Sequence, residues 1–239
     1  MRRITTTLLT PVTDLVRCAD TAVSSLGAVR GLGLLLAGCI LGWFVYVPIH
    51  ELAHAFGCIL SGGTVTRLEI DPIYGGKILA MFFPWVHGSS EYAGRLSGFD
   101  TGGNDATYLV TVLFPYSLTI LAATPALLAL SDVRRATTAR VLALGFVFPA
   151  SAAPFLSLPG DYFEAGSIVA TTAFALDPTK SHRLRSDDIF LLLTQLGKSG
   201  WTTLDVAVVI CSLGLALLLA FLTHAAGRGF ARAVFAYKT

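Results

Sequence analysis

The sequence predicts an all-α membrane protein, a polytopic helical bundle with about four principal transmembrane helices and a small β-hairpin element after the first. Two observations support this fold class. The 239-residue chain is 54% hydrophobic and only 13% charged, with a mean hydropathy of +0.70, whereas soluble domains carry roughly a quarter charged residues. Its apolar residues also gather in charge-poor stretches, and about 20 such residues in a helix cross a bilayer core.

The predicted spans cover residues 31–61, 106–131, 141–160 and 206–227. Residues 1–30 mix arginine and aspartate with leucine and valine, so we expect an interfacial amphipathic segment there. Residues 31–227 then form a membrane-embedded core, and residues 228–239 form a C-terminal tail. The nine-residue connection from Asp132 to Arg140 carries three arginines, which favours both chain ends in the cytoplasm. We expect a multi-pass protein of the cell membrane that is embedded in the lipid bilayer.

A short β element is predicted after the first span. Between Thr64 and Ile70 the side chains alternate in character, and a turn rich in glycine follows over residues 71–76. A second apolar run then covers residues 78–83. Alternation on either side of a glycine-rich turn is typical of a β-hairpin, so we predict one over residues 64–83.

The first span contains His50-Glu51-Leu52-Ala53-His54, which has the H-E-x-x-H pattern. Residues i and i+4 share a helix face, so both imidazoles can bind one zinc ion while Glu51 lies beside the open coordination position. An ionisable side chain in a membrane helix costs about 2.5–3.5 kcal/mol, so three of them together indicate a function. The alternative is structural: these groups cap a helix end or pair with one another.

A catalytic zinc ion normally has three protein ligands and a water molecule, so another ligand must come from elsewhere. Asp161 ends the third apolar stretch and lies at a similar depth to His50 and His54 if the first and third spans run in the same direction. Alternatively, Asp161 caps a helix that begins at Tyr162, and Glu164, one helical turn further on, is the substitute ligand. The other histidines have no partner at metal-ligand spacing and are expected in loops or at the interface: His87, His182 and His224.

These features resemble the site-2 protease family of intramembrane zinc metalloproteases. The resemblance covers roughly residues 40–165 and includes the His50–His54 motif, the Gly62-Gly63-Thr64-Val65 segment with the hairpin-like stretch, and the later Pro-Gly-Asp that ends at Asp161. It implies an intramembrane site with one Zn²⁺ per chain, held by His50, His54 and Asp161, and Glu51 as the catalytic base.

The chain departs from that family at two positions. The family aspartate is usually followed directly by glycine, whereas Tyr162 follows Asp161 here. The family also commonly has an asparagine near the start of a middle helix, and the single asparagine of this chain is Asn104.

The predicted function is that of a zinc metalloendopeptidase, which hydrolyses peptide bonds of membrane-embedded or membrane-proximal substrates. Its predicted partner is a transmembrane protein substrate, held in extended form by the hairpin-like stretch. The second hypothesis is a catalytically inactive membrane scaffold of the same fold that binds transmembrane segments, and the departure at Tyr162 supports it. A third, an ion or proton transporter using Glu51 and Asp161, lacks the paired repeat of such proteins. The net charge of only +2 excludes a nucleic-acid binder.

Overall fold

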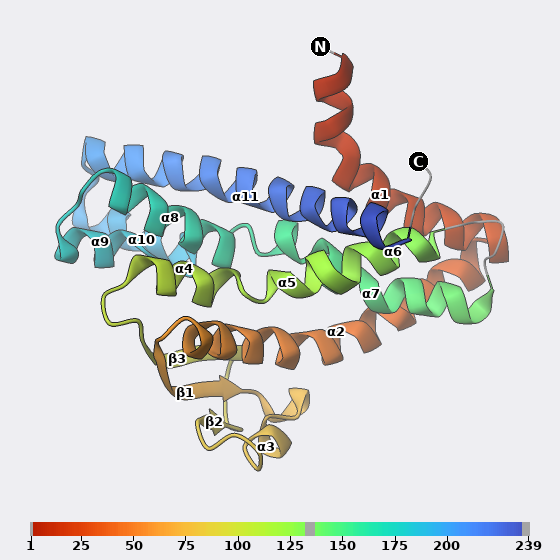
Figure 1. Ribbon diagram of the computed structural model, residues 1–239, viewed down its shortest axis with the longest axis horizontal. Coiled ribbons are helices and arrows are strands. Elements are labelled where there is room, and N and C mark those ends of the chain that lie inside the picture. The colour runs from red at the N-terminus through yellow and green to blue at the C-terminus, as the bar shows by residue number, and fades with distance from the viewer. Residues whose placement is uncertain (1, 132–136, 236–239) are drawn as a thin grey trace. The chain divides into compact units, whose positions relative to one another are not determined.

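The computed structural model describes residues 2–131 and 137–235, which are mostly helical with one small sheet (Figure 1). The elements are α1 (Arg2–Leu26), α2 (Ala28–Leu60), β1 (Thr64–Ile70), the 3₁₀ turn η1 (Pro72–Tyr74), α3 (Gly76–Leu79), β2 (Val86–His87), β3 (Gly94–Asp100), α4 (Asp105–Leu113), α5 (Tyr116–Leu118), the π-helical turn η2 (Thr119–Ala123), α6 (Thr124–Leu130), α7 (Thr138–Leu156), α8 (Asp161–Ala173), α9 (Pro178–Leu184), α10 (Ile189–Ser199) and α11 (Thr203–Phe235).

Within the described residues, three helical stretches are long and apolar enough to cross a membrane: Ala28–Leu60, Thr138–Ala173 and Thr203–Phe235. A fourth is reached only if Asp105–Leu113 and Tyr116–Leu130 count together as one broken span. Their break includes Pro115, which lacks the N–H that a continuous helix requires. These stretches are consistent with a membrane protein. Two arginines of the connection that favoured the predicted orientation, at positions 134 and 135, lie outside the described residues.

The described chain divides into two compact units. The first comprises the chain up to Val47, residues Tyr116–Ala153 and the chain from Phe221 onward; the second comprises Pro48–Pro115 and Pro154–Ala220. Helices α2 and α11 contribute residues to both units, and α11 continues through residues 228–235 of the predicted tail. The compact units therefore follow three-dimensional packing, and the division into an interfacial segment, a membrane-embedded core and a tail stays a prediction.

Close packing of α2 against α7 characterises the first unit. Gly38 and Gly42 form a G-x-x-x-G pair on α2. A Cβ atom at Gly42 would lie 2.1 Å from the carbonyl oxygen of Phe146, and one at Gly38 would lie 2.2 Å from the carbonyl oxygen of Leu142. Small residues in this spacing let two helix backbones approach closely. Both glycines are thus required by the packing of α2 on α7.

We expect Gly42→Ala to lower the thermal unfolding midpoint of the detergent-purified protein, because the added methyl group meets a backbone oxygen that cannot rotate away. Overpacking of this kind costs about 1–3 kcal/mol. Gly33→Ala is the matched control, since a Cβ atom at Gly33 has nothing within 4 Å. Equal midpoints for the two variants would contradict the close contact.

A buried ion-pair cluster joins α1 to α11 in the same unit. Asp14 and His224 are each 2% exposed. Asp14 Oδ2 lies 3.1 Å from His224 Nε2 and also accepts a hydrogen bond from Arg228 Nη1. Burial alone raises the pKa of Asp14, but the hydrogen bonds with His224 and Arg228 hold that pKa below its ordinary value. His224, which was expected in a loop or at the interface, therefore lies buried in helix α11. The sequence did not indicate this pair, because Asp14 is 210 residues away along the chain.

Asp14→Asn should destabilise the protein by about 3–5 kcal/mol at neutral pH, because it leaves Arg228 without its anionic partner. Since the folded pKa of Asp14 is lowered, its stabilisation is complete above the unfolded value and is lost as the pH falls through the folded value. Unfolding midpoints of both proteins, measured across the acid range, should therefore converge as the pH falls. Asp20→Asn, a change at an exposed position of the same helix, should have little effect, and a midpoint difference that does not narrow in acid would count against the ion pair.

The second unit contains the sheet, whose strand order is β2-β1-β3. Strand β1 pairs in parallel with β2 and antiparallel with β3, so that Ile70 lies opposite Gly94. Leu68, Ile70 and Val86 form one apolar cluster with Ala55 of α2. The sheet therefore lies along the C-terminal part of α2, and β3 is one of its two outer strands (Figure 1).

The predicted hairpin over residues 64–83 is correct in its first strand and wrong in its second. The first strand forms as β1, but its antiparallel partner is β3, and the chain from Gly76 to Leu79 forms helix α3. The Asp71 side chain accepts a hydrogen bond from the Ile73 N–H and begins the turn η1. Gly75, at φ +79°, ends this turn and begins α3. Local capping thus directs the chain into a helix where apolar character alone predicted a strand.

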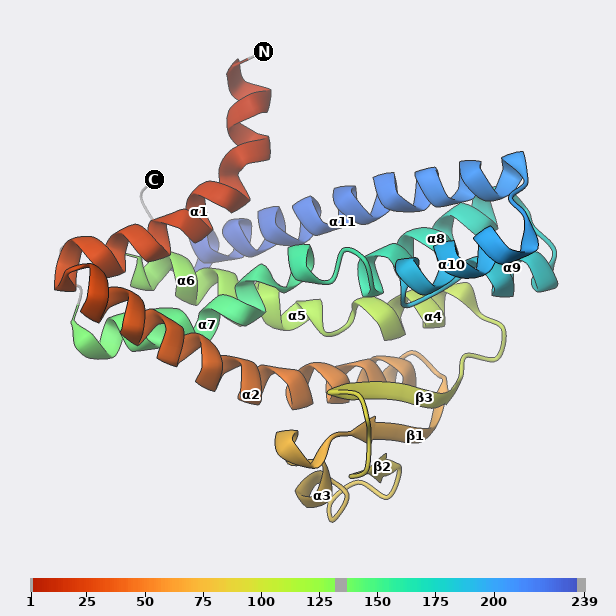
Figure 2. The ribbon, with the colours of Figure 1, turned by 180° about the vertical axis from the view of Figure 1, so that it is seen from behind.

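Two further clusters fix α8 within this unit (Figure 2). A Cβ atom at Gly166 of α8 would lie 2.3 Å from the carbonyl oxygen of Ser212 in α11, so these helices are in close contact. Val112 of α4 packs with Ala165 and Ile168 of α8. The larger cluster joins α8 to the three helices that follow it and contains Phe163, Ala170, Leu184, Ile189, Leu192, Leu196, Val208 and Val209.

Candidate metal centre

Helix α2 presents two buried histidines on one face. His50 and His54 are each 8% exposed, and their Nε2 atoms lie 3.1 Å apart. A spacing of four residues is slightly more than one helical turn, which brings both rings to the same side. The rings stand nearly perpendicular to one another, at 86°, so their nitrogen atoms meet without stacking of the ring faces.

Asp161 meets this histidine pair from α8. Its Oδ2 atom lies 3.1 Å from His50 Nε2 and 3.6 Å from His54 Nε2. Helix α8 begins at Asp161 itself, with Gly160 as the preceding cap residue, and not at Tyr162 as the capping hypothesis required. The Asp161 carboxylate is thus directed to the two imidazoles, and the first turn of α8 favours its negative charge.

The three donor atoms have the spacing of a tetrahedral metal site. Ligand bonds of about 2.0–2.1 Å in tetrahedral geometry separate the ligand atoms by about 3.3 Å, and the observed separations are 3.1, 3.1 and 3.6 Å. Two imidazoles and one carboxylate are a ligand set of catalytic zinc sites and also suit other divalent transition metals. The group formed by His50, His54 and Asp161 could therefore hold a metal ion.

A backbone carbonyl fixes the orientation of His54. Its Nδ1 atom lies 2.9 Å from the carbonyl oxygen of Thr111 in α4, and since a carbonyl only accepts, Nδ1 carries the proton. The neutral ring then has its lone pair on Nε2, the atom that faces His50 and Asp161. The Thr111 carbonyl cannot receive the usual helical bond four residues on, because that position is Pro115, which has no N–H.

Glu51 lies beside the donor atoms, held against strand β3. A Cβ atom at Gly94 would lie 2.1 Å from Glu51 Cγ and 2.5 Å from Glu51 Cδ. Any side chain at position 94 would therefore displace the carboxylate. Glycine at the start of β3 is required here by the close approach of Glu51.

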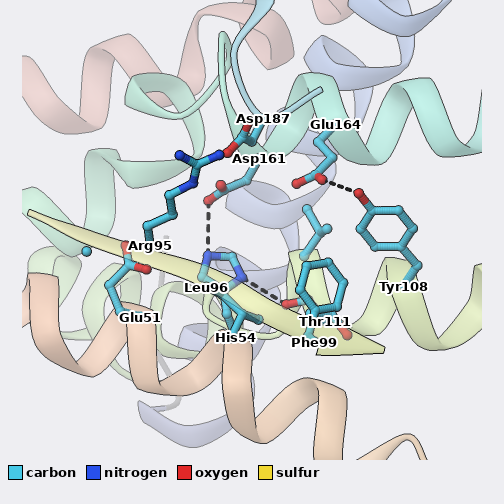
Figure 3. A pocket seen from close by; sticks show the side chains of 12 residues that line it. Glu51, His54, Arg95, Leu96, Phe99, Tyr108, Thr111, Asp161, Glu164 and Asp187 are labelled. Atoms are coloured by element: carbon cyan, nitrogen blue, oxygen red, sulfur yellow. Dashed lines mark hydrogen bonds and ion pairs between the residues drawn. The ribbon is translucent and has the colours of Figure 1, made fainter. Parts of the chain in front are cut away.

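Glu51, His54 and Asp161 line a cavity of about 260 Å³ (Figure 3). Its walls come from α2, β3, α4, α8 and the segment between α9 and α10. The remaining lining residues are Gly94, Arg95, Leu96, Phe99, Tyr108, Thr111, Val112, Glu164 and Asp187. The cavity thus brings several charged side chains next to the group of three donor atoms.

Glu164, the substitute ligand predicted from the sequence, lies in the cavity but outside the group of three donors. Its Oε1 atom accepts a hydrogen bond of 2.5 Å from the hydroxyl of Tyr108. Asn104, the single asparagine, accepts hydrogen bonds from Ala106 and Thr107 as the cap of α4 and is not among the cavity residues.

Several cavity residues were not predicted from the sequence. Nothing in the sequence marks the Thr111 carbonyl, because its availability depends on how α4 meets α2. Gly94 and Arg95 belong to β3, a strand that was not predicted, because the partner of β1 was expected at residues 78–83. A search for the residue four positions before each proline would have found Thr111 as a candidate acceptor, since its helical donor is missing.

No family model, curated protein or solved structure matches the chain. The resemblance to the site-2 protease family therefore remains a prediction from the residues that carry it.

We expect the purified protein to bind one divalent metal ion per chain, and Asp161→Ala to lower that stoichiometry. Asp161→Asn should be nearly as damaging, because an amide keeps the shape but lacks the negative charge, whereas a helix cap would tolerate asparagine. Metal content measured by mass spectrometry after dialysis checks this expectation.

His87→Ala is the control for these measurements, because His87 lies in β2 and is not among the three donors. It should retain the full metal content. Wild-type protein without stoichiometric metal would instead favour the inactive membrane scaffold, and full occupancy in Asp161→Asn would remove Asp161 from the ligand set.

Proposed function

We propose that this chain is an intramembrane zinc metalloendopeptidase, similar in its site to the site-2 proteases, and that it is a multi-pass membrane protein. The observation that carries the proposal is the convergence of His50, His54 and Asp161 at tetrahedral spacing, next to a cavity that Glu51 lines together with His54 and Asp161. A structural role for the histidine motif accounts for the paired rings, but it gives no reason for an adjacent carboxylate in a cavity.

His50, His54 and Asp161 would hold the zinc ion, which when bound supplies a Lewis acid that polarises a carbonyl group and acidifies water. The Glu51 carboxylate takes a proton from the attacking water and gives it to the amine nitrogen as the peptide C–N bond breaks. The Thr111 carbonyl keeps the His54 ring in the required tautomer. The products of this hydrolysis are a carboxylate and an amine.

Strand β3 is the proposed binding edge for the substrate. A peptide bond inside a helix is inaccessible, so a transmembrane substrate must unwind locally, and its exposed backbone groups then need partners. Gly94, Arg95, Leu96 and Phe99 of β3 line the cavity, and β3 has β1 on one side only in the described sheet. An extended peptide can add to such a strand. We assign this role to β3, whereas the sequence suggested the hairpin-like stretch over residues 64–83.

The proposal is tested with Glu51→Gln, which removes the proton acceptor and preserves the side-chain shape. We expect at least about a 100-fold loss in the rate of cleavage of a transmembrane peptide in micelles, in line with the usual contribution of general acid–base catalysis, together with unchanged metal content. Cleavage at the wild-type rate by Glu51→Gln would exclude the mechanism. A metal chelator should also abolish cleavage, and zinc should restore it.

Gly94→Ala should reduce cleavage without removing the metal, because the new methyl group occupies the position of the Glu51 side chain while leaving the three donors in place. The measurements are peptide cleavage and metal content on the same preparation. Gly197→Ala in α10 is the control, since a Cβ atom there has nothing within 4 Å. If Gly94→Ala were fully active, Glu51 could not act from the observed position.

A further inference from the structure

The proposed hydrolysis does not use two carboxylates of the cavity, those of Glu164 and Asp187. Glu164 lines the cavity together with Glu51 and Asp161 (Figure 3). It lies three residues after Asp161 in the first turn of α8, yet its Oε1 atom is bonded to the Tyr108 hydroxyl and not to the histidine pair. The bond of 2.5 Å therefore fixes the Glu164 carboxylate relative to the Tyr108 hydroxyl.

Both members of the pair come from helices that are fixed to one another. The Arg185 guanidinium donates two hydrogen bonds, of 2.7 and 2.9 Å, to the Asp105 carboxylate at the start of α4. The same carboxylate accepts a hydrogen bond of 2.5 Å from Thr172 in α8. The Tyr108 ring also packs against Phe99 of β3, with the ring centres 5.6 Å apart. The Tyr108 ring is therefore held by its helix α4 and by Phe99 of β3, and its hydroxyl in turn holds Glu164.

An extended peptide in this cavity needs more acceptors than one strand provides. Its backbone groups alternate in direction, so those that point away from β3 must find partners on another wall. Glu164 projects into the cavity from α8, which borders the cavity on a different side than β3 does (Figure 3). A carboxylate accepts several hydrogen bonds, so the bond from Tyr108 leaves capacity for a peptide N–H.

We propose that Glu164 is a substrate-binding residue and not a metal ligand: its carboxylate accepts a hydrogen bond from a backbone N–H of the extended peptide. Tyr108 is its positioning residue and acts only through Glu164. This inference rests on the proposed peptidase function. It adds α8 to β3 as a second side of the cavity that contacts the peptide. It also gives a reason for the bond between Glu164 and Tyr108 at the edge of the candidate metal centre.

A double-mutant cycle tests the assignment. Glu164→Gln should lower kcat/KM for a transmembrane peptide by about 10- to 100-fold, the range expected when a charged hydrogen bond is lost. Tyr108→Phe should lower it by a smaller factor, and should have no further effect in the Glu164→Gln background, because Tyr108 acts through the carboxylate. Metal content should be unchanged in all three variants.

Glu91→Gln and Tyr92→Phe are the matched controls, because both residues are exposed and neither lines the cavity. Each should retain the wild-type kcat/KM. Additive losses in the double mutant would overturn the positioning role of Tyr108. Loss of metal in Glu164→Gln would make Glu164 a ligand and overturn the assignment.

A binding measurement separates this inference from the proposed function. In the Glu51→Gln background, a fluorescently labelled transmembrane peptide in micelles should bind about tenfold more weakly when Glu164→Gln is added, since one charged hydrogen bond is lost. This readout requires no cleavage. Unchanged affinity would overturn the role of Glu164 even if the wild-type protein is a peptidase. If the affinity is weakened but the wild-type protein does not cleave the peptide, only the proposed hydrolysis is rejected.

Discussion

The second unit depends on one constraint: two imidazoles and a carboxylate meet within 3.6 Å inside an apolar protein. Ionisable and strongly polar groups are costly to bury unless they are paired or coordinate a cation. With Nδ1 of His54 bonded to a carbonyl, a neutral His54 ring has its lone pair on Nε2, which faces the other two donor atoms. A cation shared by all three atoms could satisfy them together.

Asp14 and Asp161 show how different partners give a carboxylate different properties. Asp14 in the first unit meets Arg228 as well as His224, so a permanent positive charge compensates it within the protein. Asp161 in the second unit meets two imidazoles. The first arrangement stabilises a helix contact. The second has the charge and spacing to receive a metal ion.

Pro115 links the course of the main chain to the site. It ends the helical hydrogen bonding of α4, and for the same reason it leaves the Thr111 carbonyl able to accept from His54. Gly94 acts in a comparable way on the other wall, where the absence of a side chain lets Glu51 lie against β3. In both places a backbone property, and not a functional side chain, determines the position of a residue that carries the proposed chemistry.

The sequence by itself determined the helical, apolar character of the chain, the first strand of the sheet, and the pairing of His50 with His54, because these depend on composition and on local periodicity. It also nominated Asp161 from its place at the end of an apolar stretch. Only the tertiary structure decided between Asp161 and Glu164 as the neighbour of the histidines, and only it identified β3 as the partner of β1. These outcomes depend on contacts between segments far apart in the chain, such as the 111 residues that separate His50 from Asp161. Local periodicity carries no information about such contacts, since they are fixed by the packing of α4, α8 and the sheet around α2.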